Sequence, residues 1–332
     1  MRRLAPLLLV LAALLAGCGS TSHQTSNQAG NRPAKTRSAT LVLDFTPNAV
    51  HAGIYTALAR GYDRAAGVSL HVITPSASTD AIRLLATGRA DFAILDIHDL
   101  AIARTRKQDI VGILPIVEHP LASVIAQPRY ASPRQLAGQT VGVTGDPSDT
   151  AVLNSILLGS GARPAAVKRI TIGFNAVGDL LAGRVAAATA FWNDEGVTLA
   201  RHRPGFHVFR VENYGAPAYP ELVLCASATA LKANPALARD TVHALVRGYD
   251  ATLADPTAAA HALESRVPGL DASLVGAELR GLLPAFRGPG GHFGVLDPAS
   301  LNAWAQWEAR FGIVKRPPDV ATTFDRAFAP RG

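Results

Sequence analysis

From residue 40 onward, short apolar runs alternate with longer amphipathic segments. Short runs bounded by polar residues are typical of buried strands, and apolar residues three and four positions apart indicate helices. The first set predicts strands at 41–43, 70–73 and 92–95, with helices at 49–60 and 79–87 between them. Strands that alternate with helices in this way form a parallel sheet covered by those helices.

A second set of the same kind follows Pro128. It predicts strands at 140–143, 170–174 and 187–191, with helices at 148–158 and 177–182. After another apolar run, Leu222–Ala226, the chain becomes mainly helical, with predicted helices at 236–254, 258–264, 271–283 and 298–311. This closing stretch has little sheet of its own, so we expect it to return and cover the first set.

Two α/β sets and a returning helical stretch predict an α/β fold with two lobes. The first lobe is expected to be discontinuous, at 39–126 plus 222–330, and the second to be inserted at 127–221. Ligands of open α/β sheets bind outside the carboxyl ends of the strands, so a ligand cleft is expected between the lobes. Tyr214–Pro220, rich in glycine and proline, is expected to be a hinge or crossover.

The composition is that of a globular protein: 332 residues, 48% hydrophobic and 17% charged. The formal charge is +7, but residues 39–332 hold 27 basic and 25 acidic side chains. Most of the excess positive charge therefore lies near the N-terminus, and a basic nucleic-acid-binding surface is not supported.

The N-terminus has the pattern of an export signal. Arg2 and Arg3 precede the apolar run Leu4–Leu15, which is shorter than the ~20 residues of a membrane-spanning helix. Because Cys18 follows at once after Ala16 and Gly17, the segment resembles a bacterial lipoprotein signal. We expect residues 1–17 to be removed, Cys18 to be lipidated on the extracytoplasmic face of the cell membrane, and the polar stretch to residue 38 to be a flexible tether. The alternative is an ordinary signal peptide with a chance cysteine.

The chain holds only one other cysteine, Cys225, inside the apolar run Leu222–Ala226. A cysteine in such a run is more often a small core residue than a nucleophile. The Cys and His spacings match no known metal motif, so neither a metal nor a cofactor is expected.

The stretch Leu43–Tyr55 is the most informative motif. It joins a strand end to a turn and then to Asn48, a good helix N-cap, so Phe45, Asn48 and His51 lie at the carboxyl end of the first strand. On residue types alone, a core phenylalanine, a capping asparagine and a hydrogen-bonded helix histidine are favoured over a binding site.

Residues 44–55 resemble the opening motif of the THI5-like group of ABC-importer substrate-binding proteins, roughly Asp-Trp-x-Pro-Asn-x-x-His-x-Gly-x-Tyr, with Phe45 at the tryptophan position. The resemblance extends over about residues 40–315 and includes 88–92, 118–123, 142–149 and 191–196. It implies a type 2 periplasmic-binding-protein fold that closes around a small heterocycle, such as a pyrimidine-type thiamine precursor. The implied partner is an ABC permease, and we expect a monomer.

On this resemblance, Phe45 and Trp192 are expected to sandwich a flat ring, since aromatic stacking favours planar ligands. Glu195 is expected to accept hydrogen bonds from an amino group or ring N–H, and Asn48 to match the alternating edge of an aminopyrimidine.

The turn Gly142–Asp149, with Gly145 and Ser148, is expected to present free backbone N–H groups to a neutral or weakly anionic group of the ligand. Asp96, His98 and Asp99 follow the strand at 92–95. Ligand contact or local capping is favoured there over a metal site, and Asp96 is the best binding candidate.

Four further features have simpler interpretations. His119 is equally compatible with binding and with a structural role, and Tyr219 is expected to close over the ligand. The stretch 288–294 is expected to be a loop rather than a phosphate cradle. Trp304 and Trp307 are expected to pack their helix onto the first lobe.

Two other functions stay open. One is a receptor for a sulfonate, nitrate or a riboflavin precursor on the same fold. The other is an enzyme, since eukaryotic THI5-type synthases share this fold and use a histidine, pyridoxal phosphate and a cysteine-rich motif. The chain has no cysteine cluster, and none of its five lysines lies near the expected cleft, so we expect a binding protein and not an enzyme.

Overall fold

The computed structural model describes residues 36–77, 80–146 and 148–331, which belong to one compact unit of the chain. The expected signal peptide and the lipidation site Cys18 lie outside these residues. In the part of the chain that is described, no helix combines the length and the apolar character needed to cross a membrane.

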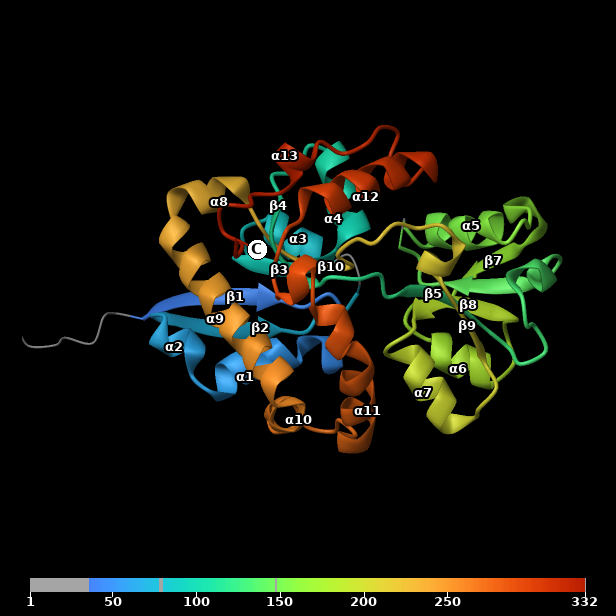
Figure 1. The fold of residues 1–332 in the computed structure, drawn as a ribbon, viewed down its shortest axis with the longest axis horizontal. Helices are drawn as coiled ribbons and strands as arrows, with labels where there is room; N and C mark the ends of the chain where they lie inside the picture. Colours follow the sequence, from blue (N-terminus) through green and yellow to red (C-terminus); the bar gives the residue numbers. More distant parts are fainter. Residues whose placement is uncertain (1–35, 78–79, 147, 332) are drawn as a thin grey trace, which may run out of the picture. The chain divides into compact units, whose positions relative to one another are not determined.

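The first sheet contains five strands in the order β2-β1-β3-β10-β4 (Figure 1). Their bounds are β1 Arg37–Val42, β2 Val68–Ile73, β3 Phe92–Asp96, β4 Val111–Val117 and β10 Leu222–Ala226. Strand β1 is parallel to β2 and β3, whereas β10 is antiparallel to β3 and β4.

The second sheet also contains five strands, in the order β7-β6-β8-β5-β9. Their bounds are β5 Ala122–Ala126, β6 Thr140–Val143, β7 Lys168–Thr171, β8 Ala187–Phe191 and β9 His207–Arg210. Strand β6 is parallel to β7 and β8, and β5 is antiparallel to β8 and β9. Two mixed sheets covered by helices confirm the predicted α/β fold with two lobes.

The helices divide between the two sheets (Figure 1). The first sheet is accompanied by α1 Ala52–Ala59, α2 Tyr62–Ala65, α3 Asp80–Ala86, α4 Ile97–Thr105, α8 Ala228–Ala233, α9 Pro235–Ala254, α10 Pro256–Glu264, α11 Ala272–Leu282, α12 Pro298–Arg310 and α13 Val320–Thr323. The second is accompanied by α5 Asp149–Gly159, α6 Ala176–Leu181 and α7 Glu195–His202. The closing helical stretch therefore returns to the first sheet, as its low strand content predicts.

Two glycines let α1 and α9 approach each other closely. A Cβ atom at Gly53 would lie 2.3 Å from Tyr249 Cγ, and one at Gly248 would lie 2.1 Å from the Gly53 oxygen. Neither position has room for a side chain. The Tyr249 hydroxyl also donates a 2.8 Å hydrogen bond to the Val50 oxygen, so this packing holds the segment that leads from β1 into α1.

Two predicted boundaries are wrong. Strand β5 pairs with β8 and β9, so the chain leaves the first sheet before residue 122 and not at 126. Both β4 and β5 are buried along their whole length, and the polar stretch Glu118-His119-Pro120 between them, rather than the end of β5, marks the crossover. The predicted tether extends to residue 38, but Arg37 already pairs with Val68 in the sheet and its guanidinium binds Asp240.

The return crossover runs from β9 to β10 through Tyr214–Pro220, as predicted. Glu221, which follows it, accepts hydrogen bonds from the N–H groups of Leu121 and Ala122 in the other crossover. The two connections between the sheets are thus pinned to each other by one buried carboxylate.

Other simple expectations are confirmed. Cys225 is a free, buried core residue. Trp304 and Trp307 are buried, and the Trp304 indole lies 3.5 Å from the His98 ring of α4, so α12 packs onto the first lobe. The stretch 288–294 forms a loop with one short 3₁₀ turn. Strands β4, β5 and β9 and helices α2, α4, α7, α8 and α13 are not among the predicted elements.

Candidate functional site: an acidic cleft with aromatic walls

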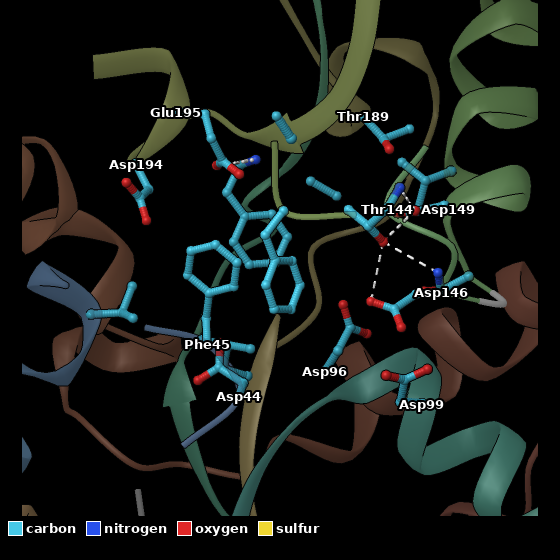
Figure 2. A pocket seen from close by; sticks show the side chains of 18 of the residues that line it. Asp44, Phe45, Asp96, Asp99, Thr144, Asp146, Asp149, Thr189, Asp194 and Glu195 are labelled. Carbon is cyan, nitrogen blue, oxygen red and sulfur yellow. Dashed lines mark hydrogen bonds between the residues drawn. The ribbon is translucent and has the colours of Figure 1, made fainter. Parts of the chain in front are cut away.

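A cleft lies where the strand ends of the two sheets meet, and its empty volume is about 930 Å³, with solvent at its mouth included. Its walls come from the ends of β1 and β3 in the first sheet and of β6 and β8 in the second (Figure 2). This is the expected position for a ligand site in open α/β sheets, and its size suits a small molecule.

The end of the cleft around Phe45 is aromatic, and we call it the aromatic end. The rings of Phe45 and Phe174 meet edge to face, with centroids 4.5 Å apart and an interplanar angle of 72°. Phe191, the last residue of β8, also lines the cleft. These rings offer flat apolar surfaces to a planar ligand.

The predicted sandwich of Phe45 and Trp192 is wrong. Trp192 does not line the cleft; its Nε1 donates to the Pro120 oxygen at 3.0 Å, and the Arg210 guanidinium lies 3.8 Å from its ring centroid. Its ring also lies against Gly281 of α11, in the other lobe. Consecutive residues at a strand end point in different directions, so Phe191 rather than Trp192 faces the cleft.

Glu195 and Asp194 lie above the aromatic end (Figure 2). Glu195 is the first residue of α7, and its Oε2 accepts a 3.0 Å hydrogen bond from the Phe191 N–H. Desolvation, with the nearby Asp194 charge, raises the pKa of Glu195 to about 8, and desolvation raises that of Asp194 to about 6. Both groups therefore gain from a ligand that donates N–H bonds to their ionised forms.

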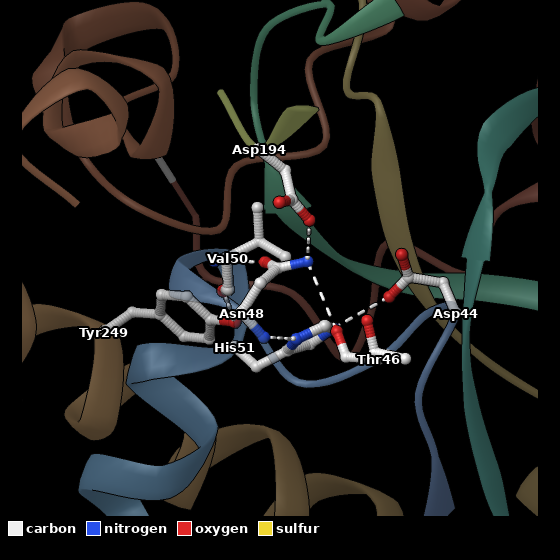
Figure 3. A network of polar contacts seen from close by, with 7 residues as sticks. All are labelled: Asp44, Thr46, Asn48, Val50, His51, Asp194 and Tyr249. Atoms are coloured by element: carbon white, nitrogen blue, oxygen red, sulfur yellow. Dashed lines mark hydrogen bonds and ion pairs between the residues drawn. The ribbon is translucent and has the colours of Figure 1, made fainter. Parts of the chain in front are cut away.

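Asn48 caps the helical segment and also joins the lobes (Figure 3). Its Oδ1 accepts from the Val50 N–H at 2.9 Å, and its Nδ2 donates to Asp194 Oδ2 at 3.0 Å. Asn48 lines the cleft, so the capping role and the predicted cleft position occur together.

His51 is fully buried and does not line the cleft. Its Nδ1 accepts from the Asn48 N–H at 3.2 Å, and its Nε2 lies 2.9 Å from Asp44 Oδ1 (Figure 3). Because Nδ1 is an acceptor, Nε2 carries the proton and donates a hydrogen bond to Asp44 Oδ1. His51 therefore positions Asp44, which does line the cleft, and the ligand contact predicted for His51 is wrong.

The opposite end of the cleft is acidic. Asp96 ends β3 and Asp99 lies in the first turn of α4, while Asp146 and Asp149 come from the turn between β6 and α5 (Figure 2). We call these four carboxylates the acidic end. Two come from each lobe.

The predicted free N–H groups of the β6–α5 turn are occupied. Asp149 Oδ2 accepts from the Thr144 N–H at 2.5 Å and from the Gly145 N–H at 3.2 Å, and the Thr144 hydroxyl donates to it at 2.5 Å. Gly145 is exposed and does not line the cleft, whereas Ser148 is buried and does. Thr144 and Gly145 therefore do not offer the free N–H groups that were predicted for a neutral or weakly anionic group of the ligand, whereas the predicted ligand contact of Ser148 stays a prediction.

The cleft is strongly acidic as a whole. Its described lining contains no lysine, arginine or histidine, and it contains seven carboxylates, namely Asp44, Asp96, Asp99, Asp146, Asp149, Asp194 and Glu195. Desolvation raises the pKa of Asp96 to about 6 and, with the charge of Asp96, raises the pKa of Asp99 well above its usual range. The arrangement favours cations and N–H donors over anions.

A buried polar network lies behind Asp96. Asp96, His98 and Glu221 have potential ligand atoms within 4.8 Å of one another, but both His98 ring nitrogens already have protein partners, Glu308 and the Tyr219 hydroxyl at 3.3 Å. Desolvation lowers the pKa of His98, yet Glu308 and Asp96 outweigh it and raise it to about 10. An imidazolium held by carboxylates is a structural ion pair, and its ring is not available to a metal.

Two other expected site residues lie outside the cleft. Tyr219 is fully buried, with its ring 5.1 Å from that of His98 and 5.8 Å from that of Trp307, so the predicted closure of Tyr219 over a ligand is wrong. His119 is exposed, and its Nε2 lies 3.1 Å from the Arg287 oxygen, which is a structural role.

Several lining residues escaped the sequence analysis: Asp44, Phe174, Phe191 and Asp194. Each lies at the end of a strand or within three residues after it. Position at a strand end was therefore a usable signal, but it does not say which of two neighbouring side chains faces the ligand.

Comparison with known proteins places these features in a family. A family model described as NMT1/THI5 like matches residues 48–259. The chain is 28% identical over 306 residues to a formylaminopyrimidine-binding protein of Halalkalibacterium halodurans, covering 90% of this chain and 92% of that protein. It is 25% identical over 321 residues to the riboflavin-binding protein RibY of Chloroflexus aurantiacus, covering 93% and 90%.

More distant likenesses are also found. A 4-amino-5-hydroxymethyl-2-methylpyrimidine phosphate synthase of Saccharomyces cerevisiae is 21% identical over 234 residues, which is 66% of this chain and 68% of the synthase. The solved structure of the periplasmic aliphatic sulphonate binding protein SsuA from Escherichia coli has a TM-score of 0.69 at 13% identity and covers 87% of this chain and 92% of that one. The structural likeness confirms the periplasmic-binding-protein fold.

Proposed function

Because the chain belongs to the NMT1/THI5-like family, we propose that it is the substrate-binding component of an ABC importer and captures a pyrimidine-type thiamine precursor or a similar N–H-rich heterocycle. The observation that carries this proposal is the lining of the cleft, where carboxylates surround aromatic faces and the described residues include no basic side chain. The similarity to a formylaminopyrimidine-binding protein over nine-tenths of the chain supports the same ligand class.

The aromatic end supplies the contacts that an aminopyrimidine needs. A flat ring beside Phe45 would bury apolar surface, and each good aromatic contact contributes about 0.5–1.5 kcal/mol. The free oxygens of Asp194 and Glu195 would accept the amino and ring N–H groups at the ring edge. Phe45 belongs to the first lobe and Asp194 and Glu195 to the second, so a ligand in contact with all three would favour the closed arrangement.

Receptors for sulfonate or nitrate require groups that stabilise an anion. The cleft opposes anions, because seven carboxylates line it and the backbone N–H groups of Thr144 and Gly145 are bound to Asp149. A riboflavin-type ligand remains the second candidate, since RibY is similar over 93% of the chain and the cleft also suits a larger flat ring system.

We propose binding and not catalysis, although the chain is similar to pyrimidine phosphate synthases. Pyridoxal phosphate needs a cationic environment for its phosphate and, in many enzymes, a lysine for its aldehyde. The described residues of the cleft supply neither, so the site does not fit that cofactor and no catalytic step is derived through it.

The leader sequence supports a lipid anchor at Cys18 on the extracytoplasmic face, and the proposed partner is the importer's permease. We propose that the receptor acts as a monomer, because a single chain contributes both walls of the cleft.

The test is a thermal-shift and calorimetric screen of the purified protein with formylaminopyrimidine, 4-amino-5-hydroxymethyl-2-methylpyrimidine, riboflavin, an alkanesulfonate and nitrate. A ligand that binds the native state stabilises it by mass action, so the true ligand class raises Tm in a dose-dependent way. We expect a rise with the pyrimidines and none with the anions. A rise with sulfonate or nitrate alone contradicts the proposal.

A further inference from the structure

The acidic end of the cleft brings together carboxylates that repel one another. Asp96 and Asp99 from the first lobe face Asp146 and Asp149 from the second (Figure 2). Their mutual charge contributes to the raised pKa of Asp99, after desolvation. In the part of the chain that the structure describes, the cleft lining offers these groups no lysine, arginine or histidine as a counter-charge.

These carboxylates keep unused acceptor capacity. Asp96 uses Oδ1 to cap α4 through the His98 N–H at 2.7 Å, and Asp149 uses Oδ2 for its contacts with Thr144 and Gly145. Asp99 accepts no hydrogen bond from any described residue, although it lies in the first turn of α4 at the cleft wall. At least one oxygen on each of the three therefore has no donor among the described residues.

Thr189 gives an independent indication of a ligand here. Its side chain lines the cleft beside Thr144 and Asp149 (Figure 2), and the residue is only 3% exposed. Its hydroxyl finds no hydrogen-bond partner among the described residues. Buried hydroxyl groups are nearly always satisfied, so an unpartnered one in a cleft wall needs a partner from outside the chain.

We propose that the acidic end binds a protonated amine carried by the ligand, so that the full ligand is an aminopyrimidine, held at the aromatic end, with a primary ammonium arm. This inference rests on the proposed function and names its substrate class. An ammonium group has three N–H donors and no acceptor, which matches several carboxylate oxygens together with the Thr189 hydroxyl oxygen.

The spacing favours an organic ammonium over a single metal ion. Among the described residues, one group of three side chains has its ligand atoms within 4.8 Å of one another, and it is Asp96 with His98 and Glu221 behind the cleft wall. The four carboxylates of the acidic end contain no such group. They surround a wider space, which a protonated amine on a short arm can enter.

The same arrangement links charge to lobe closure. Closing the cleft without a cation brings like charges from the two lobes closer, which is unfavourable in a partly desolvated site. A cation between the two pairs turns that repulsion into attraction. The ligand's ammonium group would thus select the closed form as well as occupy the site.

The test compares two ligands that differ only at the arm: formylaminopyrimidine and its deformylated primary amine. An aliphatic amine is protonated at pH 7, whereas its formamide is neutral. By isothermal titration calorimetry we expect the native protein to bind the amine at least ten-fold more tightly. Asp99→Asn and, to a smaller extent, Thr189→Val should reduce that ratio.

Two further variants locate the effect. Glu195→Gln should weaken both ligands by a similar factor, because both carry the same ring edge. Glu264→Gln, on α10 outside the cleft lining, should keep the native preference for the amine.

Equal affinities, or tighter binding of the formyl ligand, overturn the ammonium site while leaving the proposed function intact. Binding of neither pyrimidine, with binding of riboflavin or an anion instead, overturns the proposed function and this inference together. Titration with Mg²⁺ and Ca²⁺ alone supplies a further outcome. Metal binding that is lost in Asp99→Asn, without a preference for the amine, also overturns the ammonium site.

Discussion

Each end of the cleft has an acidic residue at the start of a helix that follows a strand, but the two residues differ in how many hydrogen bonds the protein gives them. Glu195 and Asp149 are both the first residue of a helix that follows a strand, and each turns back to accept an N–H from the end of that strand. Asp149 receives three hydrogen bonds from Thr144 and Gly145, whereas Glu195 Oε2 receives one from Phe191.

The difference shows that an acidic residue at a strand-to-helix turn does not by itself define a ligand contact. What matters is how much of its hydrogen-bonding capacity the local backbone already uses. Glu195 keeps one carboxyl oxygen for the ligand. At the other end of the cleft the unpartnered hydroxyl is that of Thr189 on β8, beside Asp149, and Asp99 of the first lobe lies at the same end. The variants below test whether the two ends act as separate parts of one site.

The largest effect is expected from Glu195→Gln. Hydrogen bonds to a charged group contribute about 1.5–3 kcal/mol, so affinity for an aminopyrimidine should fall roughly 10- to 150-fold. Calorimetric titration measures the change, and Glu264→Gln serves as the matched control outside the cleft. An unchanged affinity would remove Glu195 from the binding site.

A smaller loss is expected from Phe45→Ala. The variant removes one aromatic face and its buried area, and affinity should fall roughly 10-fold. Trp192→Phe is the matched comparison, because Trp192 packs on Pro120 and Arg210 outside the cleft. It should lower Tm but leave affinity within about two-fold. A larger affinity loss in Trp192→Phe than in Phe45→Ala would reverse the assignment of the two rings.

The ligand-free protein should become less stable as pH rises from 5.5 to 8. Desolvation raises the pKa of Glu195 and of the fully buried Glu221 to about 8. The folded protein therefore holds protons that the unfolded chain releases near its ordinary carboxyl pKa of about 4.3. Between pH 5.5 and 8, unfolding therefore releases these protons. Each such group lowers the free energy of unfolding by up to about 1.4 kcal/mol per pH unit.

Unfolding by urea at pH 5.5, 7 and 8 measures this slope. His98, whose pKa is raised to about 10, adds to the same fall at the upper end, because its protonated form is stabilised only in the folded state. Glu195→Gln should make the slope less steep. Stability that increases with pH over this range would contradict the desolvated state of the buried carboxyl groups.

The smallest change is expected from His51→Gln. His51 acts through Asp44 and is not in contact with the cleft, so only the position of one carboxylate changes. A glutamine keeps an N–H donor for Asp44, so affinity should fall no more than roughly five-fold, which corresponds to about 1 kcal/mol. A loss as large as that of Glu195→Gln would instead make His51 a direct ligand contact.

The sequence predicts the fold and much of the site because strand ends carry recognisable signals. Asn48 as a cap, Asp96 at the end of β3 and Glu195 after β8 all follow from local pattern and family resemblance. Pattern alone could not decide between Phe191 and Trp192, because that choice depends on the orientation of the last strand residue.

Other errors have the same origin in tertiary structure. Tyr219 and His51 were both expected to contact the ligand. Instead, Tyr219 bonds to His98, which is distant in the sequence, and His51 bonds to Asp44, so both side chains are satisfied inside the protein. The N–H groups of Thr144 and Gly145 were expected to be free, but both donate to the Asp149 side chain. Each case depends on where a side chain turns, which spacing does not specify.

An acidic cleft with aromatic walls should select an N–H-donating heterocycle and reject anions. Isothermal titration calorimetry of the purified protein at pH 7 with formylaminopyrimidine, its primary amine and an alkanesulfonate tests it most directly. We expect saturable binding of both pyrimidines, tighter for the amine, and no detectable binding of the sulfonate. Saturable binding of the sulfonate with no binding of either pyrimidine would contradict it.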